Sequence, residues 1–376
     1  MRKEWMMLTV GCLLLAGCAG ARPFELDASY YQDSAPIVND NQNVRTNQSY
    51  YHQRYGLARS GDAVYLKTFE VRSRFRLFPL AIGDYWNETI YRFDANGGKK
   101  IYAGEQTTGA EPRDISLPFY DGKLLDFNYE QNYVAPTLRY LNEATGSYEE
   151  LMTIRTPDNS ALASFEVLGG TLYLFTEGNH VYAYRDGSYE PLHLDGYGAR
   201  SSVLGMSDHE LLYCETREES SWKLRPISYD LDRREIAARY DLSPLADVFS
   251  DWYLNGFNAT PHYFYLSVCK SYDSSYGKQC LFRVRRSDLQ TVQLAEYTGD
   301  MLLNTCGGCA FLSYLDETPG LFMATPDSDT LTRLYDGEVR SINIIDDTWV
   351  FFTNENNDLY RILPDGGQPV KVGSTE

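Results

Sequence analysis

A repeating strand pattern constrains this chain more than any other feature of its sequence. A short apolar strand, a turn rich in Asp, Asn or Gly, and a second short strand recur, as in Ile90–Phe93 followed by Asp94–Gly98. The copies begin at Ile90, Leu138, Val181, Leu224, Leu281, Leu321 and Leu359. Their average spacing of about 45 residues, with turn residues inside each unit, is typical of β-propeller blades.

A second apolar strand precedes each copy. These strands lie at residues 63–66, 123–127, 171–175, 211–213, 263–266, 310–312 and 349–352. Their nearly continuous apolarity predicts strands that neighbouring blades cover on both faces. We therefore expect an all-β propeller of seven blades. Six blades are the alternative if the copy at Leu138 or Leu224 is out of register, and two smaller β domains are the other. Only residues 242–249 suggest a helical turn.

The N-terminus has the layout of a secretory signal. Arg2 and Lys3 precede an apolar run from Met6 to Ala16, which is too short to cross a bilayer. The sequence Leu15-Ala16-Gly17-Cys18 resembles the lipobox of bacterial lipoproteins. That resemblance implies cleavage before Cys18 and a lipid, such as diacylglycerol with palmitate, on the new N-terminus. An ordinary secretory signal with an incidental cysteine is the alternative.

The predicted organisation therefore has three parts. Residues 1–17 form the signal peptide, 18–54 the lipidated N-terminus and polar tether, and 55–376 the propeller. If flexible, such a tether has a root-mean-square span of roughly 30 Å. Alternatively, Tyr30-Tyr31 or Tyr50-Tyr51 pairs with the folded body as an extra strand.

The net charge of −18 excludes partners that bind through a basic surface. Because the leader carries a net positive charge, the mature chain is slightly more acidic still. Nucleic acid and anionic lipid both repel such a chain, so the membrane affinity must come from the lipid. We expect a membrane anchor on the extracytoplasmic side, in the cell envelope, and no nucleic-acid partner.

The repeats themselves resemble those of a known group. Motifs of the form apolar-Tyr-Arg-apolar, as in Ile90–Phe93 and Leu359–Ile362, are similar to those of bacterial lipoproteins with an uncharacterised extracytoplasmic propeller domain. The resemblance covers about residues 55–373 and lies in the repeat rhythm. It implies a fold and a location, and it implies no activity.

The cysteines form two candidate disulfides. Cys306-Gly307-Gly308-Cys309 suits a two-residue hairpin turn, which predicts a structural disulfide or a free pair. A redox dithiol and a metal site are the alternatives for this pair. Cys269 and Cys280 flank a long hairpin loop, and we expect them to be bonded, at a gain of roughly 3 kcal/mol. Cys214 is then left as a buried core thiol.

An insertion in the first repeat is the candidate binding loop. It spans Val71–Asn87 and contains Arg74, Phe75, Phe78, Tyr85 and Trp86. Aromatic and arginine side chains on a propeller loop favour binding, although they could simply pack on the first blade.

The sequence contains no recognisable catalytic motif, so we predict no catalytic residues, no metal and no cofactor. The predicted function is a binding or scaffolding module for a protein or glycan partner. The alternative is an extracytoplasmic enzyme. It would be either a sugar-active propeller with carboxylates at the ring's centre or a thiol-redox protein that uses Cys306 and Cys309.

Overall fold

A computed structural model describes most of the chain from Val44 onward. The described residues are 44–48, 53–77, 80–106, 117–128, 134–168, 170–198, 202–206, 209–214, 225–249, 252–270, 278–299, 301–314, 319–345 and 349–375. The predicted signal peptide, Cys18 and most of the predicted tether lie outside these ranges.

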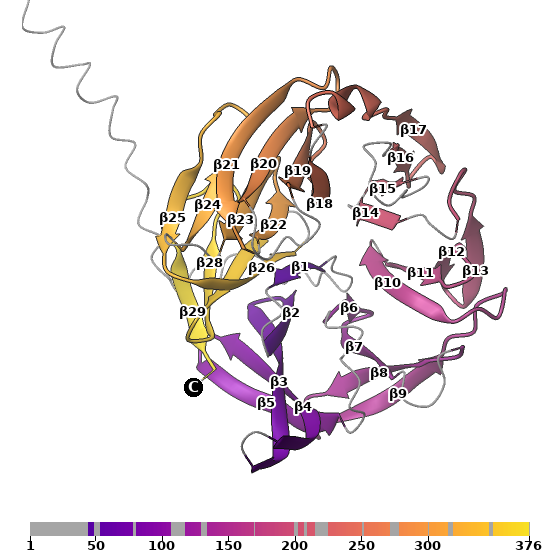
Figure 1. Ribbon diagram of the computed structural model, residues 1–376. Helices are drawn as coiled ribbons and strands as arrows, with labels where there is room; N and C mark the ends of the chain where they lie inside the picture. The colour runs from indigo at the N-terminus through magenta and orange to yellow at the C-terminus, as the bar shows by residue number, and fades with distance from the viewer. Residues whose placement is uncertain are drawn as a thin grey trace, which may run out of the picture.

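Seven antiparallel sheets form a ring, as Figure 1 shows, and each contains four strands that are consecutive in the chain. We call each set of four strands a blade. Blade 1 contains β2 (Gln53–Ser60), β3 (Ala63–Leu77), β4 (Leu80–Asp94) and β5 (Gly97–Gln106). Blade 2 contains β6 (Phe119–Tyr120), β7 (Lys123–Asn128), β8 (Thr137–Asn142) and β9 (Ser147–Thr153). Blade 3 contains β10 (Leu162–Leu168), β11 (Thr171–Thr176), β12 (Val181–Arg185) and β13 (Ser188–Leu192). Blade 4 contains β14 (Ser202–Met206), β15 (Glu210–Cys214), β16 (Pro226–Asp230) and β17 (Glu235–Arg239).

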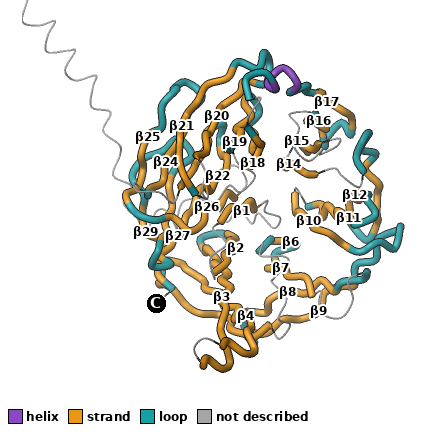
Figure 2. Tube along the Cα trace, in the orientation of Figure 1, coloured by secondary structure: helices purple, strands orange, loops and turns teal. Residues whose placement is uncertain are grey.

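The remaining blades follow the same plan. Blade 5 contains β18 (Tyr253–Ala259), β19 (Tyr263–Cys269), β20 (Lys278–Arg285) and β21 (Thr291–Thr298). Blade 6 contains β22 (Met301–Cys306), β23 (Cys309–Tyr314), β24 (Gly320–Ala324) and β25 (Thr332–Asp336). Blade 7 contains β26 (Val339–Ile345), β27 (Trp349–Asn354), β28 (Asp358–Ile362) and β29 (Val370–Ser374). Strands dominate the trace in Figure 2, and the helix described is a short 3-10 turn, η1 (Ser243–Ala246).

Each blade becomes more polar toward the outside of the ring. The middle strand β24 is buried along its whole length, whereas the outer strand β17 alternates between exposed and half-buried residues. A sheet whose two faces both meet neighbouring blades needs apolar residues on both sides, which explains the continuous apolar runs. The outermost strand borders solvent, so its residues are mixed.

Seven hydrophobic clusters fill the seven interfaces between adjacent blades. The cluster that decides the ring's closure joins Leu66 and Phe93 of blade 1 to Ile345 and Phe351 of blade 7. The first and last blades therefore pack together like any other pair. The structure confirms the seven-blade prediction and excludes both alternatives, six blades and two separate β domains.

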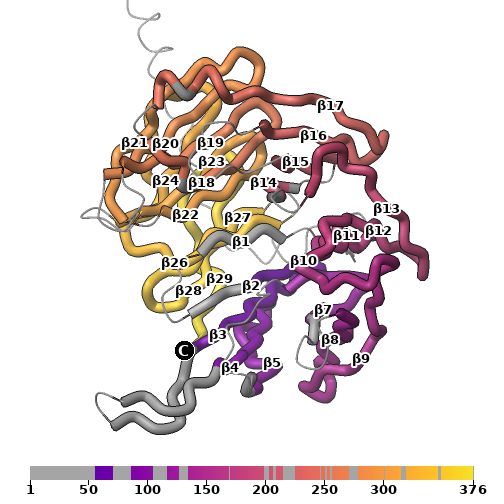
Figure 3. Tube along the Cα trace, turned by 45° about the vertical axis from the view of Figure 1, so that its right-hand side comes forward, coloured from indigo at the N-terminus to yellow at the C-terminus, as the bar shows by residue number. Residues whose placement is uncertain are grey.

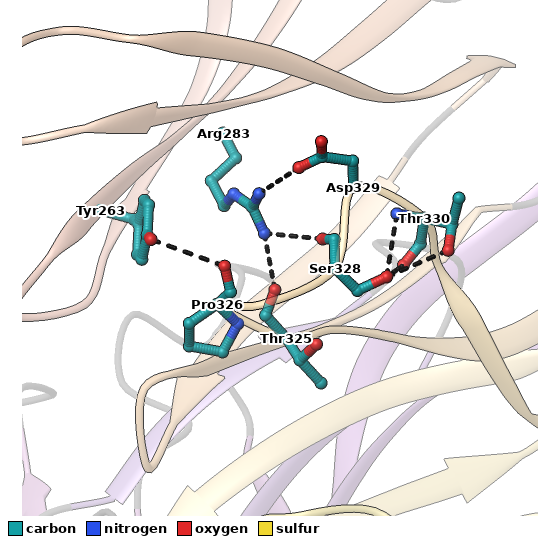
Figure 4. A network of polar contacts seen from close by, with 7 residues as sticks. All are labelled: Tyr263, Arg283, Thr325, Pro326, Ser328, Asp329 and Thr330. Carbon is teal, nitrogen blue, oxygen red and sulfur yellow. Dashed lines mark hydrogen bonds and ion pairs between the residues drawn. The ribbon is translucent and has the colours of Figure 1, made fainter.

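Polar clamps reinforce some of these interfaces. Arg283 on β20 donates to the backbone oxygens of Thr325 (2.6 Å) and Ser328 (2.7 Å) in the β24–β25 connection of the next blade. It also forms an ion pair with Asp329 at 2.6 Å, and its guanidinium lies 5.0 Å from the ring centroid of Tyr263 (Figure 4). A planar guanidinium can satisfy several acceptors at once, so this one side chain holds the connection against blade 5.

An additional strand lies inside the ring. β1 (Val44–Gln48) pairs antiparallel with β26, the innermost strand of blade 7, and it also lies beside β2 and β22. Figure 1 shows it at the centre, against β26, and Figure 3 shows the ring of blades from a second side. The segment that we predicted to be a tether thus contributes a strand at residues other than the tyrosine pairs considered above.

The direction of β1 determines at which end of the ring Val44 lies. The innermost strands of a propeller run the same way along the channel, so β1, antiparallel to β26, runs opposite to β2 as well. Gln48 therefore lies toward the end where β2 begins, and Val44 toward the end where β2 turns into β3.

Candidate binding site

The candidate binding loop is a β-ribbon. β3 and β4 pair from Val64–Phe93 to Leu77–Leu80, whereas β2 pairs with β3 only as far as Glu70 and β5 pairs with β4 only from Trp86. Residues 72–77 and 80–85 thus form a two-stranded extension beyond the blade, which we call the ribbon. The predicted binding loop therefore continues the strand pairing of its blade.

The register divides the ribbon into two faces. Residues alternate between the faces of a strand, so Arg72, Arg74 and Arg76 share one face. The opposite face holds Phe75 paired with Ile82, Leu77 paired with Leu80, and Ser73 paired with Asp84. Of the predicted binding residues, Arg74 and Phe75 lie on opposite faces, Tyr85 is paired with Arg72, and Phe78 lies outside the described residues.

Trp86 marks the point where the ribbon joins its blade. It pairs with Val71 on one side and Gln106 on the other, and its side chain is half-buried. The ribbon extends from the end of blade 1 where β2 begins. It therefore lies at the opposite end of the ring axis from Val44.

A buried ionic network lies just beneath the ribbon, between blades 1 and 2. Lys67 on β3 is fully buried, and Glu88 and Asp126 are only 1% and 5% exposed. The Lys67 Nζ lies 2.8 Å from Asp126 Oδ1 and 3.5 Å from Glu88 Oε1. One ammonium group thus joins the two strands of the ribbon's base to β7 of the next blade.

Two further side chains complete this network. Arg139 Nε binds the second oxygen of Asp126 at 2.6 Å, and the Tyr148 hydroxyl donates to Glu88 at 2.5 Å. The Arg139 guanidinium lies 4.2 Å from the centroid of the Tyr148 ring. The positive charges of Lys67 and Arg139 balance the negative charges of the two carboxylates. Each carboxylate also accepts a hydrogen bond, as buried charges require.

The titration behaviour follows from these contacts. Burial alone would raise the pKa of Asp126, but the charges and hydrogen bonds of Lys67 and Arg139 outweigh it and lower that pKa. Burial, together with the negative charges of Asp126 and Glu88, raises the pKa of Tyr148 well above its usual value. Asp126 is therefore an ionised ion-pair partner at neutral pH, and Tyr148 is a neutral hydrogen-bond donor.

Glu88 and Asp126 are paired carboxylates of the kind that a sugar-active propeller would need. Both are buried and both contact Lys67, so they do not line an open cavity. Sequence reasoning missed this network. Its signal was a lone charged residue inside each of two apolar runs, Lys67 after Leu66 and Asp126 after Leu125.

Among the cysteines that the structure describes, neither candidate disulfide, Cys269–Cys280 or Cys306–Cys309, is formed. Cys280 lies opposite Val268 in the register, and Cys269 lies opposite Gln279, so the two cysteines are offset by one residue. Cys214 is fully buried, as predicted.

Cys306 and Cys309 lie directly opposite each other across the predicted two-residue turn. Gly307 and Gly308 at its centre both have positive φ, which favours glycine. Burial, and then the charges of Asp365 and Asp327, raise the pKa of Cys309. Its thiolate is therefore scarce at neutral pH, contrary to what a redox dithiol needs.

Small cavities lie beside blades 2, 3 and 4. One of about 360 Å³ lies at the end of blade 2 formed by the β6–β7 and β8–β9 turns and is lined by Lys123, Tyr140 and Glu143. The other, about 120 Å³, lies between blades 3 and 4 and is lined by Arg185 and Arg234.

In the part of the chain that the structure describes, no cluster of three or more His, Cys, Asp or Glu side chains is placed to hold a metal ion. Within the same residues, no helix has the length and apolarity to span a membrane.

Comparisons with known proteins bear on the fold. No protein-family model matches the chain. No curated protein matches it. Among solved structures, the WD40 propeller domain of Doa1 is 14% identical and covers 90% of this chain and 98% of its own, with a TM-score of 0.37.

Two further solved structures are similar at this level. The propeller domain of the Trilobed protease from Pyrococcus furiosus is 10% identical, covers 85% and 98%, and has a TM-score of 0.43. An oligogalacturonate lyase is 9% identical, covers 86% and 96%, and has a TM-score of 0.41. These solved structures assign no activity to this chain.

Proposed function

We propose that this protein is a lipid-anchored binding module on the extracytoplasmic side of a bacterial cell membrane. In this proposal Cys18 carries the lipid, the propeller is a rigid scaffold, and the ribbon recognises an anionic protein or glycan of the cell envelope. The observation that carries the proposal is the ribbon itself, a paired extension beyond blade 1 with three arginines on one face.

The arginine face is unusual within this chain. The sequence as a whole has a net charge of −18, yet Arg72, Arg74 and Arg76 fall at alternate positions of one strand. Arginine binds carboxylate and phosphate groups in a forked geometry, and arginine and aromatic residues are enriched where interfaces gain most of their energy. A local basic surface on an acidic body favours docking of an anionic partner at that surface.

The base of the ribbon supports a role in recognition. Isolated two-stranded hairpins are only marginally stable in water. Here both strands continue into a four-stranded blade, and Lys67 and Glu88 join them to Asp126 of blade 2. A ribbon held at its base loses less conformational entropy on binding than a free loop would.

The position of the ribbon supports presentation away from the membrane. Val44, where the described chain begins, lies at the end of the ring opposite the ribbon, as the directions of β1 and β2 require. With a lipid at Cys18, the ring end nearest the anchor would then be the one that carries the β2–β3 turn. The ribbon would face the outer layers of the envelope.

Two observations weigh against the enzyme alternatives. The paired carboxylates Glu88 and Asp126 are buried and neutralised by Lys67, so this pair is closed to a sugar. Cys309 has a raised pKa, which disfavours thiol-redox chemistry.

Retention of the mature chain on immobilised poly-L-glutamate and on polygalacturonate tests the ribbon. We expect retention at low salt despite the net negative charge, and loss of at least tenfold in Arg72→Ser/Arg74→Ser/Arg76→Ser. The control Arg185→Ser/Arg233→Ser/Arg285→Ser removes the same charge from exposed positions outside the ribbon. Equal behaviour of the two triple variants, or no retention of the wild type on either polymer, would contradict the proposal.

The anchor has a separate test. Cells expressing the full chain should incorporate labelled palmitate into it, and Cys18→Ala should abolish both the label and recovery in the membrane fraction. A product that keeps Met1, or a label that survives the substitution, would refute anchoring at Cys18.

A further inference from the structure

The inner edge of blade 7 differs from the other inner edges in the described part of the ring. In the other sheets the first of the four consecutive strands is the inner edge of the sheet. In blade 7, β1 pairs with β26 and forms a fifth strand inside it. The pairing is complete along β1, from Val44 opposite Ile345 to Gln48 opposite Ser341. An unpaired strand edge presents a row of backbone donors and acceptors, and β1 satisfies that row on β26.

Asparagine side chains link the innermost strands of blades 5, 6 and 7 to one another. Asn258 of β18 donates its amide to the backbone oxygen of Leu303 on β22, at 3.2 Å. Asn304 of β22 donates in the same way to Ile342 on β26, at 3.3 Å. Each asparagine thus ties one blade to the next at the channel wall. From β26 to β2, where the last blade meets the first, β1 lies alongside both strands.

The topology makes the interface between blades 7 and 1 the one at which the ring would open most easily. The four main strands of each blade are consecutive in the chain. Without β1, no sheet would therefore contain strands from both ends of the chain. Without β1, the first and last blades are joined by packing, such as that of Leu66 and Phe93 against Phe351. β1 adds a hydrogen-bonded ladder to blade 7 from a segment directly continuous with blade 1.

We propose that the inner edge of β26 is a strand-binding site whose ligand is the chain's own segment Val44–Gln48, and that this strand clasps the first and last blades together. The mode is β-strand addition, in which backbone hydrogen bonds supply affinity. Because only residues 49–52 separate β1 from β2, the segment is presented at a high effective concentration, and a competing peptide is at a disadvantage. The proposal is independent of the lipid and of the ribbon's partner.

Hydrogen exchange on the intact mature chain tests the site directly. Amides that face β26 within Val44–Gln48 should exchange at least tenfold more slowly than their intrinsic rates, because strand pairing protects them. Exchange at the intrinsic rate throughout this segment in the wild type would overturn the proposal.

Paired substitutions test the clasp. Arg45→Pro/Thr46→Pro removes backbone donors from β1, and Arg45→Ala/Thr46→Ala changes the same side chains while keeping them. The proline variant should lose the protection and unfold at a lower temperature than the alanine variant. A synthetic peptide of residues 41–50 should restore part of that loss, and a scrambled peptide should not.

Equal unfolding temperatures of the two variants would refute the clasp. If the proline variant does not fold while the alanine variant does, that outcome supports the clasp, and the exchange of the wild type still decides whether the site is occupied.

Discussion

Replacing Lys67 by methionine should destabilise this protein strongly, because it leaves two carboxylates buried without their shared cation. Lys67 is fully buried and contacts Asp126 at 2.8 Å and Glu88 at 3.5 Å. Removal of one partner of a buried ion pair typically costs about 3 to 5 kcal/mol. Asp126 keeps Arg139, so we expect Lys67→Met to lose about 3 kcal/mol of unfolding free energy in urea titrations near pH 8.

The cost should depend on pH in a defined direction. In the wild type the pKa of Asp126 is lowered, so its contribution is present above about pH 4 and is lost as pH falls through the lowered value. In Lys67→Met the two like charges should make the folded protein hold a proton that the unfolded chain releases. The variant therefore gains stability as pH falls, and its deficit should shrink by at least about 1 kcal/mol between pH 8 and pH 5.

Two controls make this reasoning refutable. Lys278→Met breaks an exposed ion pair with Glu296 and should leave the unfolding free energy nearly unchanged, because solvent screens that pair. Lys67→Met/Glu88→Leu removes the uncompensated charge and should recover most of the loss, since apolar replacement of buried ion pairs is often neutral. A deficit below about 1 kcal/mol for Lys67→Met, or one that does not shrink at pH 5, would show that the network does not hold blades 1 and 2 together.

Three further predictions follow from the ring's other contacts. Arg283→Lys keeps the charge but cannot reach two carbonyls and Asp329 together, so it should cost about 2 kcal/mol by urea titration; an unchanged midpoint would contradict the clamp. Cys306 and Cys309, both buried, should resist iodoacetamide at neutral pH until the protein unfolds, as mass spectrometry of the alkylated protein will show; rapid labelling of Cys309 in the native state would contradict a buried thiol of raised pKa. Gly308→Ala should lower the unfolding free energy by about 1 kcal/mol because φ is +86° there, and a stabilised variant would refute that turn geometry.

Much of the ring could be predicted because its determinants are local. The apolar strands that begin at Ile90, Val181 and Leu281 carry their pattern in a few consecutive residues, and β4, β12 and β20 include them. The Gly307-Gly308 turn could also be predicted from the sequence, since only a few residue types adopt positive φ without strain.

The candidate site could be predicted only in part. The insertion after Val71 was recognised, but its strand pairing was not, although the alternation of Arg72, Arg74 and Arg76 is the period of a strand. β1 escaped prediction because Val44–Gln48 is a largely polar segment whose strand conformation comes from an edge nearly 300 residues away in the sequence.

The sequence by itself determined the number of blades, the positions of their apolar strands and the acidity of the body, because periodicity and composition are properties of short windows. Only the tertiary structure decided which charged side chains meet and at which end of the ring β1 begins. Lys67 and Asp126 become partners because adjacent blades pack face to face, and β1 finds β26 because closure of the ring brings the first and last blades together.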